Sequence, residues 1–429
     1  MVEMEYNSQE EDILNKTKPF DISKDLVMQA YEQVKANKGA AGIDQQSLED
    51  FDKNLKDNLY KLWNRMSSGS YFPPPVMAVP IPKKSGGVRI LGIPTVADRI
   101  AQMVVKLMFE PNVEPHFLPD SYGYRPNKSA LDAVGVTRQR CWKYDWVVEF
   151  DIKGLFDNID HELLMKAVKR HTDDKCILLH IERWLKAPMQ CANGEVVARN
   201  RGTPQGGVVS PMLSNIFMHY AYDAWMSKYQ PTVPWCRYAD DGLAHCKTEN
   251  EALQILAELT QRFKKCGLEM HPDKTKIVYC KDDKRKGEYP KVEFEFLGYC
   301  FRQRVVKNSK SKKLFSGFLP AASKTAIKSM RTKTRTLGIR LMTELSLLDI
   351  AKICNPILRG WINYYGKYGW HGLRSVLRHF NKTLVTWAMR KFKKLKRRRG
   401  KATHFIINIQ RKQPELFAHW KFGIGRTVT

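Results

Sequence analysis

Acidic residues are scarce in the last 129 positions of this 429-residue sequence, which contain 3 of its 44 Asp and Glu but 31 of its 72 Lys and Arg. The first 300 residues carry 41 residues of each sign, so the formal net charge of +28 belongs to the C-terminal part. Such a basic region indicates a polyanionic partner, as nucleic acids are. Hydrophobic residues make up 43% of the chain, which excludes a disordered polyelectrolyte.

Other absences narrow the class of protein further. No run approaches the roughly 18–20 apolar residues of a membrane span. The N-terminal segment MVEMEYNSQEEDILNK is acidic and polar, unlike a secretory signal. The nine cysteines form no C-x-x-C pair, so the closely spaced ligands of a structural zinc site are missing. We therefore expect a cytoplasmic protein with reduced thiols and no membrane partner.

Hydrophobic periodicity divides the chain into four segments. Residues 1–75 are expected to be a mostly helical N-terminal extension that ends at consecutive prolines. Residues 76–305 mix strand and helix patterns, which predicts an α+β domain. Residues 306–390 begin with a basic link, and the signals from Ser323 onwards are mostly helical. Residues 391–429 contain the densest basic run and are expected to form a basic tail.

Turn signals place three loops of the α+β segment. Residues 76–90 predict two strands joined by Lys-Lys-Ser-Gly-Gly, and residues 235–246 predict two strands around an Asp-Asp-Gly turn. Another strand is expected at 146–151. The Gly-rich loop at 202–207 precedes a helix, for which we expect Ser210 as the N-cap and Pro211 at the first helical position.

Three carboxylates stand at the ends of predicted strands: Asp240 and Asp241 at the hairpin turn, and Asp151 after an apolar strand. Adjacent carboxylates repel one another, and a divalent cation with hard oxygen ligands, above all Mg²⁺, relieves the repulsion. If the strands lie side by side, Asp151 and Asp240 can share two ions about 3.5–4 Å apart and promote nucleotidyl transfer. The alternative is an Asp-Asp-Gly turn without function.

The surrounding motifs resemble those of a known family. Residues 150–159, 202–211 and 238–241 are similar to successive polymerase motifs of reverse transcriptases. The segments 41–44, 90–95 and 121–126 narrow the resemblance to the bacterial group II intron type, and 355–366 resembles the maturase segment of such proteins. The resemblance covers about residues 20 to 420. It implies a right-hand polymerase fold with fingers and palm in 76–305, a helical thumb and maturase segment in 306–390, and a nucleic-acid-binding tail. The helical thumb and the segment after it are expected over 315–395.

The resemblance implies roles for the acidic residues and for two motifs beside them. Asp151, Asp240 and Asp241 match the catalytic metal ligands of two Mg²⁺ ions, with Mn²⁺ as an alternative, and Asp151 and Asp240 are expected to bridge them. Phe156 matches the side chain that excludes a ribose 2′-hydroxyl and so favours dNTPs; the alternative is a core residue. Gln205 matches a residue that lines the nascent base pair, and Gly206 would let the backbone approach the nucleotide.

The resemblance also implies that basic residues bind the phosphates of the nucleotide. Lys83 and Arg89 match contacts from the fingers to the incoming triphosphate, and Lys84 is an alternative to Lys83. Without the resemblance, the favoured interpretation of this segment is an exposed charged hairpin. Lys276 matches a lysine near the leaving pyrophosphate, and Lys274 is its alternative within the same basic loop.

The C-terminal segment suggests two RNA-binding features. Aromatic residues and hydrogen-bond donors are interleaved around Trp361. This mixture suits RNA, because unstacked bases can lie on aromatic rings while the donors reach phosphates. The alternative is a helix core with Trp361 buried and the polar side chains outward. Residues 391–399 contain seven Lys and Arg, which favours non-specific phosphate binding. The RNA-binding candidates are Arg359, Asn363, Lys367, Lys393, Lys394, Arg397 and Arg398.

The leading interpretation is an RNA-directed DNA polymerase that extends a DNA primer on an RNA template with dNTPs. The resemblance adds that it binds group II intron RNA to assist splicing and mobility (retrohoming) into a target DNA, in the bacterial cytoplasm and at the nucleoid. The sequence ends at Thr429 without the paired His and Cys of an endonuclease, so it resembles the endonuclease-lacking branch, with a primer expected from elsewhere. The alternatives are a splicing-only maturase and a domesticated reverse transcriptase in phage defence.

Overall fold

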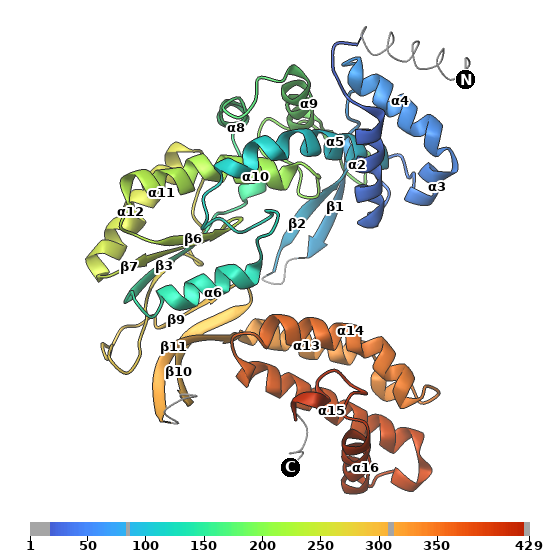
Figure 1. Cartoon of the computed structure of the whole chain (residues 1–429), viewed down its shortest axis with the longest axis vertical. Coiled ribbons are helices and arrows are strands. Elements are labelled where there is room, and N and C mark those ends of the chain that lie inside the picture. The colour runs from blue at the N-terminus through green and yellow to red at the C-terminus, as the bar shows by residue number, and fades with distance from the viewer. Residues whose placement is uncertain (1–17, 83–85, 308–312, 424–429) are drawn as a thin grey trace, which may run out of the picture. The chain divides into compact units, whose positions relative to one another are not determined.

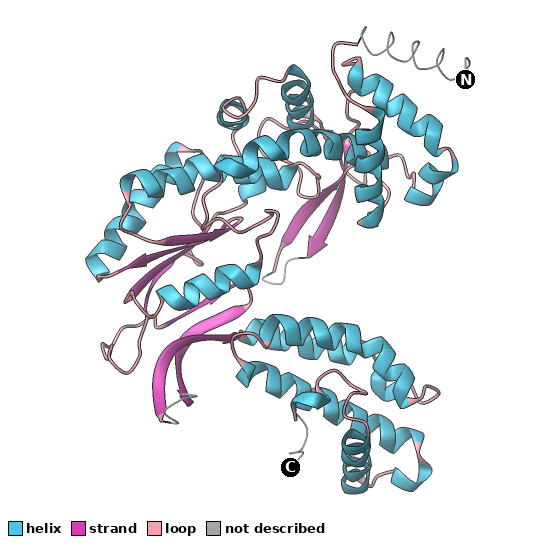
Figure 2. Cartoon of the chain, in the orientation of Figure 1, coloured by secondary structure: helices cyan, strands magenta, loops and turns pink. Residues whose placement is uncertain are grey.

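The computed structural model describes residues 18–82, 86–307 and 313–423, in which helices alternate with short sheets (Figures 1 and 2). The α+β prediction is confirmed. The chain divides into two compact units. Unit 1 comprises the described residues of Met1–Ser129, Phe150–Gly242 and Gln254–Thr275, and unit 2 comprises those of Ala130–Glu149, Leu243–Leu253 and Lys276–Thr429.

Unit 1 begins with helices α2 (Lys24–Ala36), α3 (Leu48–Lys53) and α4 (Leu55–Ser67). The hydroxyl of Ser23 caps α2 by accepting a hydrogen bond from the amide of Leu26. The apolar stripe of α2, which includes Val27 and Val34, is buried, as its 3.6-residue periodicity predicts. The helical N-terminal prediction is therefore confirmed for the described residues.

The next sheet of unit 1 has the strand order β2-β1-β4-β5. Strands β1 (Val76–Pro82) and β2 (Val88–Ile93) form the predicted antiparallel hairpin, with Met77 opposite Ile93. Lys83 and Lys84, which were predicted to contact the triphosphate, lie outside the described residues. The short strands β4 (Met189–Gln190) and β5 (Val196–Val197) complete this sheet.

Unit 1 contains further helices. Their bounds are α5 (Val96–Val113), η1 (Glu114–His116), α7 (Leu155–Asn158), α8 (His161–Val168), α9 (Lys175–Lys186), α10 (Ser210–Met218), η2 (His219–Asp223) and α11 (Ala224–Tyr229). The prediction that Ser210 is an N-cap is wrong, because α10 begins at Ser210 and Val209 precedes it. The Ser210 hydroxyl instead accepts a hydrogen bond from the Thr203 hydroxyl, at 2.7 Å.

A four-stranded sheet with the order β6-β7-β3-β8 carries the acidic motifs. Its strands are β6 (Trp235–Tyr238), β7 (Asp241–Cys246), β3 (Trp146–Asp151) and β8 (Lys276–Tyr279). The hairpin prediction is confirmed, but the turn is shifted. Ala239 and Asp240 form it, with Ala239 at a φ of 57°, and Asp241 already belongs to β7. Helix α12 (Glu249–Lys265) follows.

Unit 2 contains α6 (Ala130–Arg140) and a sheet with the order β11-β10-β9. Its strands are β9 (Glu293–Phe296), β10 (Tyr299–Lys307) and β11 (Leu314–Ala322). The expectation of helix from residue 315 is wrong for β11. This strand pairs with β10 along its whole length and buries Phe318, so the ladder satisfies the backbone groups on the side that faces β10.

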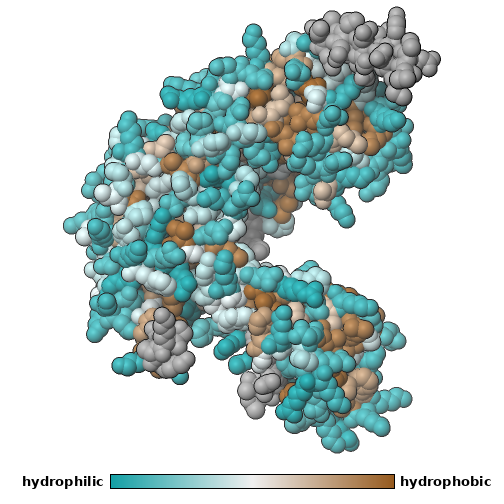
Figure 3. Space-filling model, viewed as in Figure 1, coloured by the Kyte–Doolittle hydropathy of each residue, from teal (hydrophilic) through white to brown (hydrophobic). Residues whose placement is uncertain are grey.

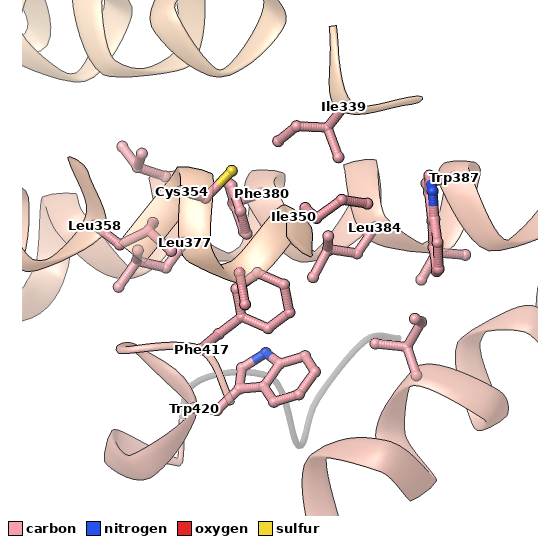
Figure 4. Packing of buried hydrophobic residues seen from close by; sticks show 14 of the residues in the cluster. Ile339, Ile350, Cys354, Leu358, Leu377, Phe380, Leu384, Trp387, Phe417 and Trp420 are labelled. Atoms are coloured by element: carbon pink, nitrogen blue, oxygen red, sulfur yellow. The ribbon is translucent and has the colours of Figure 1, made fainter. Parts of the chain in front are cut away.

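The helices of unit 2 enclose their own hydrophobic core, part of which is drawn in Figure 4. They are α13 (Lys324–Thr336), η3 (Ile339–Leu341), α14 (Leu347–Tyr365), α15 (Trp370–Lys391), η4 (Lys393–Leu395), α16 (Arg399–Lys412) and η5 (Trp420–Phe422). Phe417 and Trp420, from beyond α16, are buried in this core, and the Phe417 ring lies 5.8 Å from that of Phe380. The segment expected to be a basic tail is thus folded onto the helices over its described residues.

Hydrophilic residues cover much of the face seen in Figure 3. Within the described ranges, no helix has the length and apolar character needed to cross a membrane. All nine cysteines carry free thiols, and eight of them are buried.

Candidate functional site

Strand pairing brings the three predicted carboxylates together. Asp151 ends β3, and Asp241 begins the neighbouring strand β7. The amide of Ile152 donates a hydrogen bond to the carbonyl of Asp240 at 3.3 Å, which ties the turn to the end of β3. The side-by-side arrangement predicted for these two segments is therefore confirmed.

The turn that carries Asp240 is held by a buried arginine that the sequence interpretation missed. Arg237 is fully buried and forms a two-pronged ion pair with Asp223, with both contacts at 2.7 Å. The same guanidinium donates to the carbonyl of Ala239 at 3.1 Å and to the hydroxyl of Ser121 at 2.8 Å. The signal in the sequence was an arginine within an otherwise apolar strand, since a buried charge must be paired.

Burial and mutual repulsion shift the pKa values of two aspartates in the acidic group. Burial, followed by the charges of Asp240 and Asp151, raises the pKa of Asp241 to about 8. Burial and the charge of Asp151 also raise the pKa of Asp240. Lys274 is the cation at this site, and its Nζ lies 2.8 Å from Oδ2 of Asp151. Partial burial opposes the protonation of Lys274, but the contact with Asp151 outweighs it and raises the pKa of Lys274.

Carboxylate oxygens are the ligand type that Mg²⁺ prefers. Within the described part of the chain, no group of three or more His, Cys, Asp or Glu is placed so that it could hold a metal ion. Mg²⁺ commonly keeps several waters and binds through one or two carboxylates together with substrate phosphates. Burial is the main cause of the raised pKa values of Asp240 and Asp241, and the like charge of the neighbouring carboxylates, which a divalent cation would relieve, adds to it.

The structure distinguishes the two lysines that the sequence left open. Lys276 lies opposite Glu149 in the β3–β8 register, and its Nζ is 3.1 Å from the Glu149 carboxylate. Burial raises the pKa of Glu149 to about 7, and Lys276 opposes that rise. Of the two predicted lysines, Lys274 is the one that contacts the carboxylate of Asp151, and the choice between them for the pyrophosphate position stays a prediction.

The predicted nucleotide-binding residues of unit 1 are exposed to different degrees. Phe156 on α7 is half-buried, whereas its neighbours Leu155 and Ile159 are fully buried, so the core of α7 does not need the Phe156 ring. The Gln205 amide donates weak hydrogen bonds to the carboxylate of Asp157, at 3.3 and 3.4 Å. Arg89 is exposed on β2.

The structure shows why position 206 requires a glycine, which the sequence alone did not reveal. Its φ is 123°, and a Cβ atom there would lie 2.5 Å from the carbonyl oxygen of Gly92 on β2. The amide of Gly92 also donates to the carbonyl of Gln205 at 2.8 Å. The close approach that requires glycine at this position is therefore to the β1–β2 hairpin.

The candidate RNA-binding residues all lie on the surface of unit 2. Arg359, Asn363 and Lys367 are exposed on or just after α14. The prediction of a buried Trp361 is wrong, because Trp361 is half-buried and packs against the edge of the helical core. The exposed basic residues around η4 are Lys393, Lys394, Arg397 and Arg398.

The tyrosines of the same segment hold the fold together. The Tyr364 hydroxyl donates to the carbonyl of Leu297 at 2.7 Å, and the ring of Tyr365 lies 5.5 Å from that of Tyr299. These contacts join α14 to the turn between β9 and β10. Base stacking on these two rings is therefore a weaker interpretation than structural packing.

An α+β fold with carboxylates grouped at adjoining strand ends suits a polymerase, and the comparison with known families identifies which one. Residues 81–301, just over half of the chain, match the family described as reverse transcriptase (RNA-dependent DNA polymerase), and the chain belongs to that family. Residues 327–405, which include α14 and α15, match the group II intron, maturase-specific domain.

Three proteins are similar to this chain over half of its length or more. Protein YkfC of Escherichia coli (strain K12) is 32% identical over 291 residues, which cover 58% of this chain and 75% of YkfC. The group II intron-encoded protein LtrA of Lactococcus lactis subsp. cremoris is 27% identical over 445 residues, which cover 84% of this chain and 72% of LtrA. The putative COX1/OXI3 intron 1 protein of Saccharomyces cerevisiae is 31% identical over 225 residues, or 52% of this chain and 26% of that protein.

Proposed function

We propose that this reverse transcriptase is encoded by a group II intron, extends a DNA primer on an RNA template with dNTPs, and also binds its intron RNA to assist splicing and mobility. The observation that carries the proposal is the group of Asp151, Asp240 and Asp241 with Lys274 in one chain with a maturase-specific domain. An intact acidic site argues against a maturase whose polymerase part is inactive.

In this proposal the three aspartates hold two Mg²⁺ ions, or Mn²⁺ in their place. Such ions, when bound, activate the primer 3′-hydroxyl and stabilise the charge of the leaving pyrophosphate. Lys274 stays protonated because of its acidic neighbours, so its ammonium group can donate hydrogen bonds to pyrophosphate oxygens. Arg89 and Lys83 would contact the triphosphate.

Two further residues would select the incoming nucleotide. Gln205 would line the nascent base pair, beside the loop at Gly206. Phe156, with its ring half-exposed, would exclude the ribose 2′-hydroxyl and so favour dNTPs. A ring at this position discriminates by steric exclusion, because the extra hydroxyl of an rNTP would overlap it.

Intron RNA would bind the basic surface of unit 2. The exposed residues Arg359, Asn363 and Lys367, with Lys393, Lys394, Arg397 and Arg398, can reach phosphates without disturbing core packing. The same surface can contact the target DNA during mobility. These partners are found in the bacterial cytoplasm and at the nucleoid, where the activity would take place.

Primer extension tests the polymerase. Asp240→Ala should abolish cDNA synthesis from an RNA template, whereas Asp173→Ala, at an exposed position of unit 1, should leave it unchanged. Undiminished synthesis by the Asp240 variant would refute the assigned site.

Splicing of the host intron at low Mg²⁺ tests the second activity. A variant with glutamine at Lys393, Lys394, Arg397 and Arg398 should no longer assist splicing, while it should still extend a primer on an unrelated template. The slope of log affinity against log salt concentration should become shallower by about 0.7–0.9 for each phosphate that the variant no longer neutralises. Normal splicing by this variant would contradict the RNA-binding assignment.

A further inference from the structure

The ring of Tyr124 packs against the ring of Phe156 in unit 1. The ring centroids are 6.4 Å apart and the ring planes meet at 81°, an edge-to-face arrangement within the favourable range for aromatic pairs. Tyr124 belongs to the loop before α6, about 30 residues from Phe156 in the sequence, and no role was assigned to it from the sequence.

The loop that carries Tyr124 is firmly held. Nη1 of Arg125 donates to the carbonyls of Leu118 and Ser121, at 2.7 and 2.9 Å. Nδ2 of Asn215 donates to the carbonyl of Gly123 at 2.7 Å. Tyr124 itself has a φ of 57°, which a bulky residue adopts only where surrounding contacts impose it.

This loop also places the Tyr124 side chain at the acidic site. A Cβ atom on Gly123 would lie 2.4 Å from the amide nitrogen of Ala239, so the loop lies directly against the turn that carries Asp240. Partial burial and the charge of Asp240 raise the pKa of the Tyr124 hydroxyl. Tyr124 nevertheless keeps 53% of its surface exposed.

Phe156, by contrast, has limited support from its own helix. Helix α7 spans only Leu155–Asn158, and its N-cap, Gly154, provides no side-chain hydrogen bond. The carbonyl of Phe156 accepts from the amide of Thr203 at 2.7 Å, which fixes the backbone but not the ring. A ring can exclude a 2′-hydroxyl only if it cannot rotate away, so it needs a neighbour that restrains it.

We propose that Tyr124 is a positioning residue that restrains the Phe156 ring and thereby sets the discrimination between dNTPs and rNTPs. The inference rests on the proposed function, because it requires Phe156 to contact the sugar of the incoming nucleotide. Tyr124 acts through the Phe156 ring, and its hydroxyl group is not required.

Single-nucleotide incorporation on an RNA template tests this inference through kcat and KM for matched dNTP and rNTP. Tyr124→Asn removes the ring, and asparagine tolerates the positive φ. This variant should lower the dNTP preference about 2- to 10-fold, the range expected for one aromatic contact. The change should appear as a lower KM for rNTP, with kcat for dNTP retained. Tyr124→Phe should behave as the wild type, and Tyr229→Asn, at an exposed tyrosine of α11, serves as the matched control.

A separate variant tests the proposed role of Phe156, on which the inference about Tyr124 depends. Phe156→Val should relax sugar discrimination strongly, and adding Tyr124→Asn to it should produce little further change, because Tyr124 acts only through the ring that Phe156→Val removes. If Phe156→Val leaves discrimination intact, the proposed role of Phe156 fails. If Phe156→Val relaxes it but Tyr124→Asn does not, or if Tyr124→Asn abolishes dNTP incorporation as well, the inference about Tyr124 is overturned.

Discussion

The ammonium group of Lys274 lies 2.8 Å from the carboxylate of Asp151, whereas Lys276, two residues later, is paired with Glu149. The start of β8 separates the two lysines. Lys274 precedes the strand, in the loop after α12, and Lys276 is its first residue and lies opposite Glu149 in the ladder. Of the two lysines, it is therefore Lys274 that stands beside the acidic group.

Exchange of each lysine for methionine should separate their roles. Lys274→Met should reduce primer extension about 100-fold, as removal of a preorganised charge at a reacting phosphate typically does. Lys276→Met should change the rate little, because its carboxylate partner Glu149 can take up a proton near neutral pH. Single-turnover rates with dNTP would measure both effects. Equal reductions in the two variants would contradict the assignment of Lys274.

Mg²⁺ binding should depend on pH through Asp241. The folded-state pKa of Asp241 is about 8 against an ordinary value of 3.8, so between these values the folded state binds more protons than the unfolded state. Without metal, this group makes the free energy of unfolding fall as pH rises from about 4 to about 8. Mg²⁺ competes with the proton, so the rise in Tm caused by Mg²⁺ should be larger at about pH 9 than at about pH 6.

The Asp241→Asn variant is the control for that measurement. Its Tm should depend less on pH and should rise less when Mg²⁺ is added. A Tm increase by Mg²⁺ that is the same at both pH values in the wild type would contradict the prediction.

Removal of the buried partner of Arg237 should destabilise the site and the fold together. Asp223→Asn would leave the fully buried guanidinium without its countercharge, at a cost of about 3–5 kcal/mol in the free energy of unfolding. Primer extension should also fall, because Arg237 positions the carbonyl of Ala239 beside Asp240. Glu182→Gln, which breaks the exposed pair with Lys186, should cost only about 0–1 kcal/mol. Urea unfolding of both variants would measure the difference, and similar costs would argue against the buried pair.

The end of the chain should contribute to the stability of the helical unit. Phe417→Ala removes a fully buried ring from the core in Figure 4 and should lower the free energy of unfolding by about 3–5 kcal/mol. Leu348→Ala, at an exposed position of α14, should have little effect. Chemical unfolding followed by a fluorescence or circular-dichroism signal would compare them. A Phe417 variant as stable as the Leu348 variant would indicate a tail that is not part of the core.

Local patterns were sufficient for much of the fold and for the acidic site. The helices around Val27, the hairpin at residues 76–93 and the strand-turn-strand at Asp240 follow from periodicity and turn residues, which operate within a few positions of the sequence. Local patterns did not predict β11, which ends just before the helical signals that begin at Ser323. Pairing with β10 and burial of Phe318 define this strand.

The sequence by itself determined the family, the three aspartates and the basic C-terminal surface, because each is encoded by neighbouring residues or by composition. Tertiary structure alone decided that Lys274 meets Asp151, that Tyr124 packs against Phe156 and that Phe417 joins the helical core. These contacts join residues far apart in the chain. Their geometry depends on strand register, loop conformation and packing, which no local pattern of residues specifies.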